Sequence, residues 1–146
     1  MPGSRVRPMV IRAELATDAD ATWAALTDPD QVERWFTRAS PVGTVGDAYV
    51  LDFGPGDVMR GEILEVVPSV RLAYSWGWGD GPGAVRTRVC WDLAPVDDGT
   101  LVTLTHGGWS EAGLTAKDRD QHATHWDGYV AALVEATDED VAGEDA

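Results

Sequence analysis

Histidine is the side chain best suited to transferring protons near neutral pH, and the chain contains three. His106 ends the segment TLVTLTH, where it alternates with Val102 and Leu104 and so shares their inward face. A buried imidazole needs a hydrogen-bond partner. His106 is therefore either a core histidine satisfied by a backbone carbonyl or a tyrosine hydroxyl, which we favour, or a residue that contacts a ligand or acts as an acid or base. In the second case Tyr49 or Tyr74 would assist it.

The other two histidines, His122 and His125, are three residues apart on a predicted helix, with Asp118 one turn earlier. This spacing could chelate a metal ion. However, one helix supplies only two or three ligands, and the HExxH pattern is absent. We therefore predict neither a metal ion nor another cofactor.

Nucleophilic chemistry has little support in the sequence. Cys90 falls on the polar, outward face of a predicted strand, which it shares with Arg86, Arg88 and Asp92. No base that could activate its thiol is evident beside it. No GxSxG motif is present. His106 is thus the one candidate catalytic residue, and we favour a protein that is not an enzyme.

Tryptophan offers flat apolar contact to a ligand, and seven occur in the chain. Trp76 continues the inward face of Leu72 and Tyr74, which suits core packing and a cavity wall equally. Trp78 lies where the run GWGDGPG begins, and we place it at a cavity rim, on a loop that opens for a ligand. For each of the other candidate cavity residues we favour core packing over a cavity wall; they are Trp35, Tyr49, Phe53, Tyr74, Trp91, His106, Trp109, Trp126 and Tyr129.

These residues require elements to position them. Alternating residues predict a first strand over Met9 to Ala16, and two short helices follow, with Asp28-Pro29 starting the second. From Val45 to Trp109 the pattern predicts an antiparallel meander of five strands. Apolar residues spaced by three or four predict a final helix from about Thr115 to Ala136. The order predicts an α+β domain in which the sheet grips this helix.

Three motifs in this order resemble the START-like, or SRPBCC, superfamily and within it the bacterial activator of heat-shock protein 90 ATPase homologue family. The motifs are TWAALTDPDQVERWF, GEILEVVPSVRLAYSW, and GTLVTLTHGGW followed by HWDGYVAALVEA. The resemblance implies a helix-grip fold: a curved antiparallel sheet of six or more strands around the long C-terminal helix, with two short helices after the first strand. It also implies a deep apolar cavity between sheet and helix.

Members of this superfamily include ligand carriers, and aromatases and cyclases of polyketide pathways. Our first hypothesis is a protein that binds a small hydrophobic or aromatic molecule in the cavity, as a carrier, sensor or sequestering resistance protein. The second is a cyclase, dehydratase or hydrolase that acts on a polyketide-like ligand through His106. The third is an interaction module that acts as a chaperone partner.

The net charge of −14 arises from 25 acidic and 11 basic residues, and it disfavours nucleic acid as a partner. No stretch is apolar enough for membrane insertion, and no signal peptide is evident. We therefore expect a cytoplasmic monomer or homodimer. Residues 1–146 form one predicted domain, with an ordered core over about 9–136 and an acidic, frayed tail over about 137–146.

Overall fold

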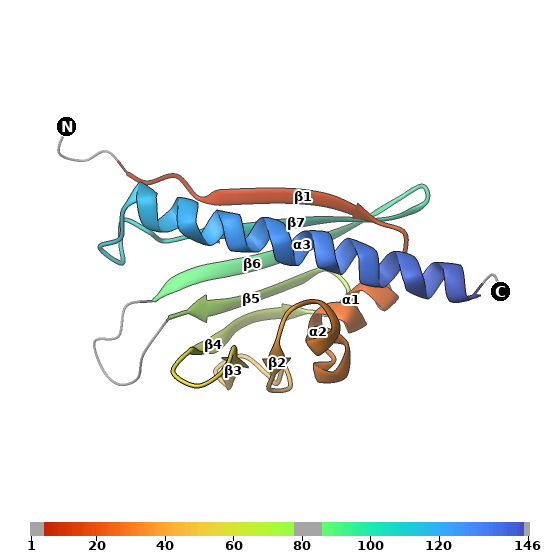
Figure 1. The fold of residues 1–146 in the computed structure, drawn as a ribbon, viewed down its shortest axis with the longest axis horizontal. Helices are drawn as coiled ribbons and strands as arrows, with labels where there is room; N and C mark the ends of the chain where they lie inside the picture. Colours follow the sequence, from red (N-terminus) through yellow and green to blue (C-terminus); the bar gives the residue numbers. More distant parts are fainter. Residues whose placement is uncertain (1–4, 78–85, 145–146) are drawn as a thin grey trace.

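A computed structural model describes the fold of residues 5–77 and 86–144. Within these residues, seven antiparallel strands form one sheet in the order β1-β7-β6-β5-β4-β3-β2. The elements in chain order are β1 (Met9–Leu15), α1 (Ala19–Thr27), α2 (Pro29–Trp35), β2 (Arg38–Ala39), β3 (Ala48–Asp52), β4 (Val58–Val67), β5 (Arg71–Trp76), β6 (Thr87–Val96), β7 (Gly99–Gly107) and α3 (Ala116–Glu144). The sheet curls around α3, which lies along one of its faces (Figure 1). The predicted helix-grip fold is confirmed.

The strands form because apolar residues alternate with polar ones, so that one face of each strand can be buried. In β7 the side chains of Val102, Leu104 and His106 are buried, whereas their neighbours in the chain are only half-buried. The register places Val89 of β6 opposite His106 and Trp91 opposite Leu104. This pairing aligns the inward residues of both strands on the face that α3 covers.

Local capping starts the two short helices, the second of them at the Asp28-Pro29 position that the sequence predicts. The carboxylate of Asp18 accepts a hydrogen bond from the Ala21 backbone N–H at 2.8 Å, and Asp28 caps α2 with Pro29 at its first position. Val32 and Trp35 form the buried stripe of α2. The indole N–H of Trp35 donates to the carbonyl of Ala25 at 2.8 Å, which joins α2 to α1.

The long helix α3 continues to Glu144, eight residues beyond the predicted end at Ala136. The acidic residues of this segment predicted fraying, but only part of the segment faces solvent. Thr137 is buried, and its hydroxyl donates to the carbonyl of Leu133 at 2.9 Å. Asp140 forms an ion pair with Arg34 of α2 at 3.0 Å. The predicted helix end was therefore wrong, because contacts with α2 extend the helix.

The core lies between the sheet and the three helices, and Trp126, Val130 and Leu133 are the buried residues of α3 within it. Trp126 is 2% exposed, as a helix gripped by the sheet requires. Among the helices of residues 5–77 and 86–144, none has both the length and the apolar composition needed to cross a bilayer.

Candidate ligand-binding site

His106 is fully buried, and both of its ring nitrogens are hydrogen-bonded. The indole N–H of Trp126 donates to Nδ1 at 3.0 Å, and an indole nitrogen can only donate. Nδ1 therefore carries no hydrogen, and Nε2–H donates to the hydroxyl of Thr87 at 2.6 Å. The Thr87 hydroxyl in turn donates to the carbonyl of Trp76 at 3.2 Å. The geometry thus assigns a neutral His106 with its hydrogen on Nε2.

The surroundings of His106 keep it neutral. Its ring packs against Trp109 with centroids 4.2 Å apart, and the Trp109 indole donates to the His106 carbonyl at 2.8 Å. Burial, and then the charge of nearby His122, lower the pKa of His106 to about 3. This geometry fits a core histidine, although its partners are a threonine hydroxyl and an indole rather than a carbonyl or a tyrosine.

Tyr49 and Tyr74 lie elsewhere in the core. Their ring centroids are 4.8 Å apart, and the Tyr74 hydroxyl accepts a hydrogen bond from the indole of Trp91 at 3.2 Å. Burial raises the pKa of both hydroxyls. Among the described residues, no tyrosine contributes a ring contact or hydrogen bond to His106. The predicted assistance of His106 by a tyrosine therefore has no structural counterpart here.

Phe36 lies at the centre of the aromatic residues between α2 and α3. It follows the last residue of α2 and stacks on Trp35, with centroids 5.0 Å apart and ring planes 12° apart. Its other ring neighbours, all within 6.3 Å, are Phe53, Trp76, Trp126 and Tyr129. Phe36 was missed as a site residue, although its i+4 spacing from Val32 placed it on the buried stripe of α2.

A cleft of about 350 Å³ opens at the edge of this aromatic cluster, and we call it the aromatic cleft. The rings that line it come from the turn after β3, the end of β5 and one face of α3: Phe53, Trp76, Trp126 and Tyr129. Its polar lining residues are Asp57, Gln121, His122 and His125. Trp76 and Trp126 are 6% and 2% exposed, so they form its floor.

The turn between β3 and β4 positions two residues of the aromatic cleft. Gly54 and Gly56 take φ values of 123° and 83°, a region that favours glycine. Phe53 and Asp57 close the turn, because the Phe53 N–H donates to the Asp57 carbonyl at 2.9 Å. The GPG turn thus places Phe53 and Asp57 together at the aromatic cleft.

His122 and His125 both line the aromatic cleft, and both use the same ring nitrogen to bond the helix backbone. Nδ1 of His122 lies 2.8 Å from the Asp118 carbonyl, and Nδ1 of His125 lies 3.0 Å from the Gln121 carbonyl. A carbonyl only accepts, so each Nδ1 carries the hydrogen. In the neutral ring, Nε2 is then a hydrogen-bond acceptor. Among the described residues, neither Nε2 has a hydrogen-bond partner.

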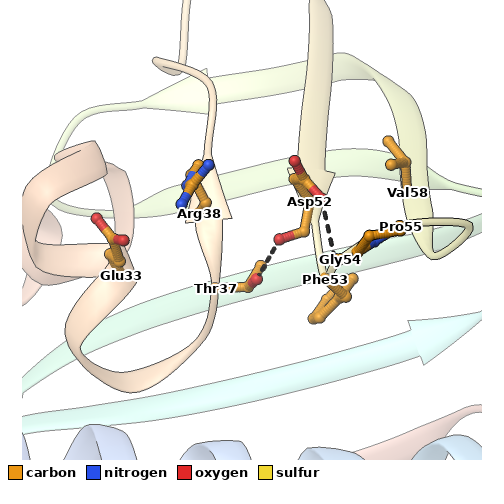
Figure 2. A pocket seen from close by; sticks show the side chains of 8 residues that line it. All are labelled: Glu33, Thr37, Arg38, Asp52, Phe53, Gly54, Pro55 and Val58. Atoms are coloured by element: carbon orange, nitrogen blue, oxygen red, sulfur yellow. Dashed lines mark hydrogen bonds between the residues drawn. The ribbon is translucent and has the colours of Figure 1, made fainter.

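A second, larger cleft of about 650 Å³ lies beside Phe53, and its walls are both polar and apolar (Figure 2). Thr37 donates to the Asp52 carbonyl at 2.6 Å, and the Gly54 N–H donates to the Asp52 carboxylate at 2.9 Å. Phe53 lines both this cleft and the aromatic cleft.

The structure brings only part of the predicted cavity residues together. Four of the predicted residues line the aromatic cleft: Phe53, Trp76, Trp126 and Tyr129. Five others are packed in the core: Trp35, Tyr49, Tyr74, Trp91 and Trp109. Trp78 and the glycine-rich loop fall outside the described residues. The sequence prediction missed Gln121 and Asp57, which also line the aromatic cleft.

The remaining candidate groups do not form a reactive site. Cys90 is half-buried and hydrogen-bonds to Asp92 at 3.5 Å, and burial raises the pKa of its thiol to about 11. Such a thiol is a poor nucleophile near neutral pH. Within residues 5–77 and 86–144, no three histidine, cysteine or acidic side chains gather as metal ligands would.

Several solved structures have a fold similar to that of this chain. DynU16, from the dynemicin biosynthetic locus, is 28% identical with a TM-score of 0.77; the match covers 88% of this chain but 46% of DynU16. CalU16 from Micromonospora echinospora is 25% identical with a TM-score of 0.75, over 94% of this chain and 80% of CalU16. The Aha1 dimer from Colwellia psychrerythraea is 23% identical with a TM-score of 0.76, over 89% and 95%. No curated protein matches the sequence significantly.

These likenesses differ in what they show. At 23% identity, the likeness to the Colwellia protein shows the fold alone, so its dimeric state is not transferred to this chain. The family model described as "Activator of Hsp90 ATPase homolog 1-like protein" matches residues 16–138, which is most of the chain. That range includes both short helices, β2 to β7 and most of α3. The chain therefore belongs to the Activator of Hsp90 ATPase homolog 1-like protein family.

Proposed function

We propose that this protein binds a small hydrophobic or aromatic molecule in the aromatic cleft. One observation carries the proposal: four aromatic rings and four polar side chains converge on a space of about 350 Å³. Ligand sites are typically apolar pockets of roughly 300–1,000 Å³ with a few placed polar groups. The volume is near the lower end of that range, which favours a small, flat ligand.

The aromatic residues of the cleft suit a flat ring. The Tyr129 ring lies 4.7 Å from the Phe36 ring and 6.1 Å from the Phe53 ring, so its position is fixed by packing. A preorganised wall loses little side-chain freedom when a ligand binds. Each favourable ring pair contributes roughly 0.5–1.5 kcal/mol beyond the apolar area that it buries.

A binding role suits the chemistry of the site better than catalysis by His106. Both nitrogens of His106 are engaged, the side chain is fully buried, and its pKa is lowered to about 3. An acid or base must reach the reacting group and change protonation state near the working pH. We therefore propose a carrier or sequestering protein. DynU16, a 28% identical relative from a biosynthetic locus, supports a polyketide-like natural product as the ligand class.

Intrinsic tryptophan fluorescence tests the proposal, because Trp76 and Trp126 form the floor of the cleft. We expect naphthalene-based probes to change this fluorescence saturably. Tyr129→Ala should weaken binding by about tenfold, which corresponds to the roughly 1.4 kcal/mol of one ring contact. Val134→Ala is the matched control, since Val134 is also half-buried on α3 but lies outside the cleft. Equal affinities of both variants and the unaltered protein would contradict the proposed site.

A further inference from the structure

We propose that His122 and His125 select flat aromatic ligands that carry a hydrogen-bond donor, such as a phenolic hydroxyl, over ligands of the same shape without one. This inference rests on the proposed binding function and names its ligand class. It follows from the fixed orientation of the two imidazoles and from the charge of the cleft.

The helix backbone sets the orientation of each imidazole. Both Nδ1–H groups donate to the carbonyl of the residue four positions earlier, at 2.8 Å for His122 and 3.0 Å for His125. The two rings therefore use the same nitrogen for the helix. Each neutral ring leaves Nε2 as an acceptor, and both residues line the aromatic cleft. A ligand that approaches the cleft meets two acceptors one helical turn apart.

The donors of the cleft are fewer than its acceptors. The Trp126 indole N–H is already used by His106, which leaves it unable to bind a ligand oxygen. Asp57 adds a carboxylate, which is an acceptor when ionised. Among the described residues that line the cleft, none is a lysine or arginine. A ligand carboxylate or phosphate would find no permanent cation there and would face Asp57.

Two other polar side chains of the cleft, Gln121 and Tyr129, favour neither donors nor acceptors. Gln121 presents both donors and an acceptor, so it can accommodate either kind of ligand. The Tyr129 hydroxyl can likewise both donate and accept a hydrogen bond. Burial raises its pKa, which keeps it protonated. The net charge of −14 also disfavours the approach of anions. The ligand that best matches the cleft is a neutral aromatic ring with a hydroxyl or amino group at one edge.

Three naphthalene probes separate the possibilities: 2-naphthol donates a hydrogen bond, 2-methoxynaphthalene cannot donate, and 2-naphthoate is an anion. Affinities are measured at about pH 8, above the ordinary titration range of imidazole. We expect 2-naphthol to bind about tenfold more tightly than 2-methoxynaphthalene, the effect of a hydrogen bond of roughly 1.4 kcal/mol. We expect 2-naphthoate to bind most weakly.

Variants assign the preference to the two imidazoles. The double substitution His122→Leu and His125→Leu should bring the ratio of the first two affinities close to one. The pair His122→Gln and His125→Gln should keep the ratio above one, because an amide oxygen also accepts. A ratio that stays tenfold in the leucine variant, or a ratio of one in the unaltered protein, overturns the inference. Failure of all three probes to bind overturns the proposed function itself.

Nitrogen-15 NMR of the unaltered protein gives a second test that needs no substitution. The Nε2 resonances of His122 and His125 should move when 2-naphthol is added, because a lone pair that accepts a hydrogen bond is perturbed. The same resonances should move much less with 2-methoxynaphthalene. Equal responses to both probes would overturn the inference even if the leucine variant failed to fold.

Discussion

The indole N–H of Trp126 donates to Nδ1 of His106 across 3.0 Å, so α3 is hydrogen-bonded to β7 through two buried side chains. The same imidazole donates through Nε2 to Thr87 of β6. One histidine therefore connects the gripped helix to two strands of the sheet. These hydrogen bonds give His106 a structural role, so substitutions of its partners should change the free energy of unfolding.

Trp126→Phe should destabilise the fold by about 1–3 kcal/mol, because the buried Nδ1 of His106 would lose its donor. Denaturant unfolding measures the change in free energy. Trp23→Phe is the control: Trp23 is half-buried on α1, and its indole forms no hydrogen bond among the described residues. If both substitutions cost the same, the hydrogen bond to His106 does not contribute to stability.

Trp126→Ala should cost more, roughly 3–5 kcal/mol, because it also empties a large aromatic site. The Trp126 ring contacts Phe36, Trp76 and Trp91, with centroids between 5.2 and 5.7 Å away. Those rings would lose packing partners on one side. The same denaturation experiment measures the loss. A cost no larger than that of Trp126→Phe would show that the neighbouring rings close the space.

The three histidines should show two different tautomers by nitrogen-15 NMR. The hydrogen-bond partners place the hydrogen of His106 on Nε2 and that of His122 and His125 on Nδ1. The chemical shifts of the two ring nitrogens report which one is protonated. A spectrum with His106 protonated on Nδ1 would contradict the assigned donation from Trp126.

Alternation along the strands was enough to predict which face of the sheet is buried. His106 and Trp76 point inward as predicted, because a period of two leaves only one choice once neighbouring apolar residues are placed. The order of the predicted elements followed from the same periodicities, whereas the two-residue strand β2 was not predicted. The family resemblance is confirmed as well, by a match over residues 16–138.

The cleft could be predicted only in part. Its rings were among the candidates, but the contributions of His122 and His125 depend on how α3 is rotated against the β3–β4 turn. That rotation is set by tertiary packing around Phe36, whose backbone leaves the helical region at φ −121° and ψ −90°. Helical periodicity carries no information about such a side-chain position. The proposed gating by Trp78 stays a prediction.

The end of α3 was mispredicted for a similar reason. Local composition from Thr137 onward favoured fraying, whereas a contact more than 100 residues away in sequence, between Arg34 and Asp140, extends the helix. The Arg34 guanidinium also donates to the Ala136 carbonyl at 3.2 Å. A backbone carbonyl near the predicted helix end is thus satisfied by a residue of α2.

Removal of the chain after Ala136 should lower the melting temperature by more than a few degrees, because it deletes buried Thr137 together with Asp140. Asp140→Asn alone should cost at most about 1 kcal/mol, since both partners of the ion pair are substantially exposed. Asp138→Asn is the control, as Asp138 is exposed and makes no ion pair among the described residues. An unchanged melting temperature after truncation would show that the last turns of α3 do not stabilise the fold.

Stability should fall in mild acid because of His106. Its pKa is lowered from 6.5 to about 3, first by burial and then by the charge of His122. Between these values the unfolded chain binds one more proton than the native protein, so the contribution is complete above pH 6.5 and is lost as the pH falls toward 3. The slope should approach about 1.4 kcal/mol per pH unit.

Two comparisons isolate this contribution. Asp118 has a lowered pKa, first from a hydrogen bond with the Thr115 backbone, so its effect appears only below the ordinary value of 3.8. The window between pH 6.5 and 4 therefore reports mainly on histidine. His106→Gln should flatten the slope there. If the His106→Gln variant keeps the slope of the unaltered protein, the unfolding free energy is not linked to the protonation of His106.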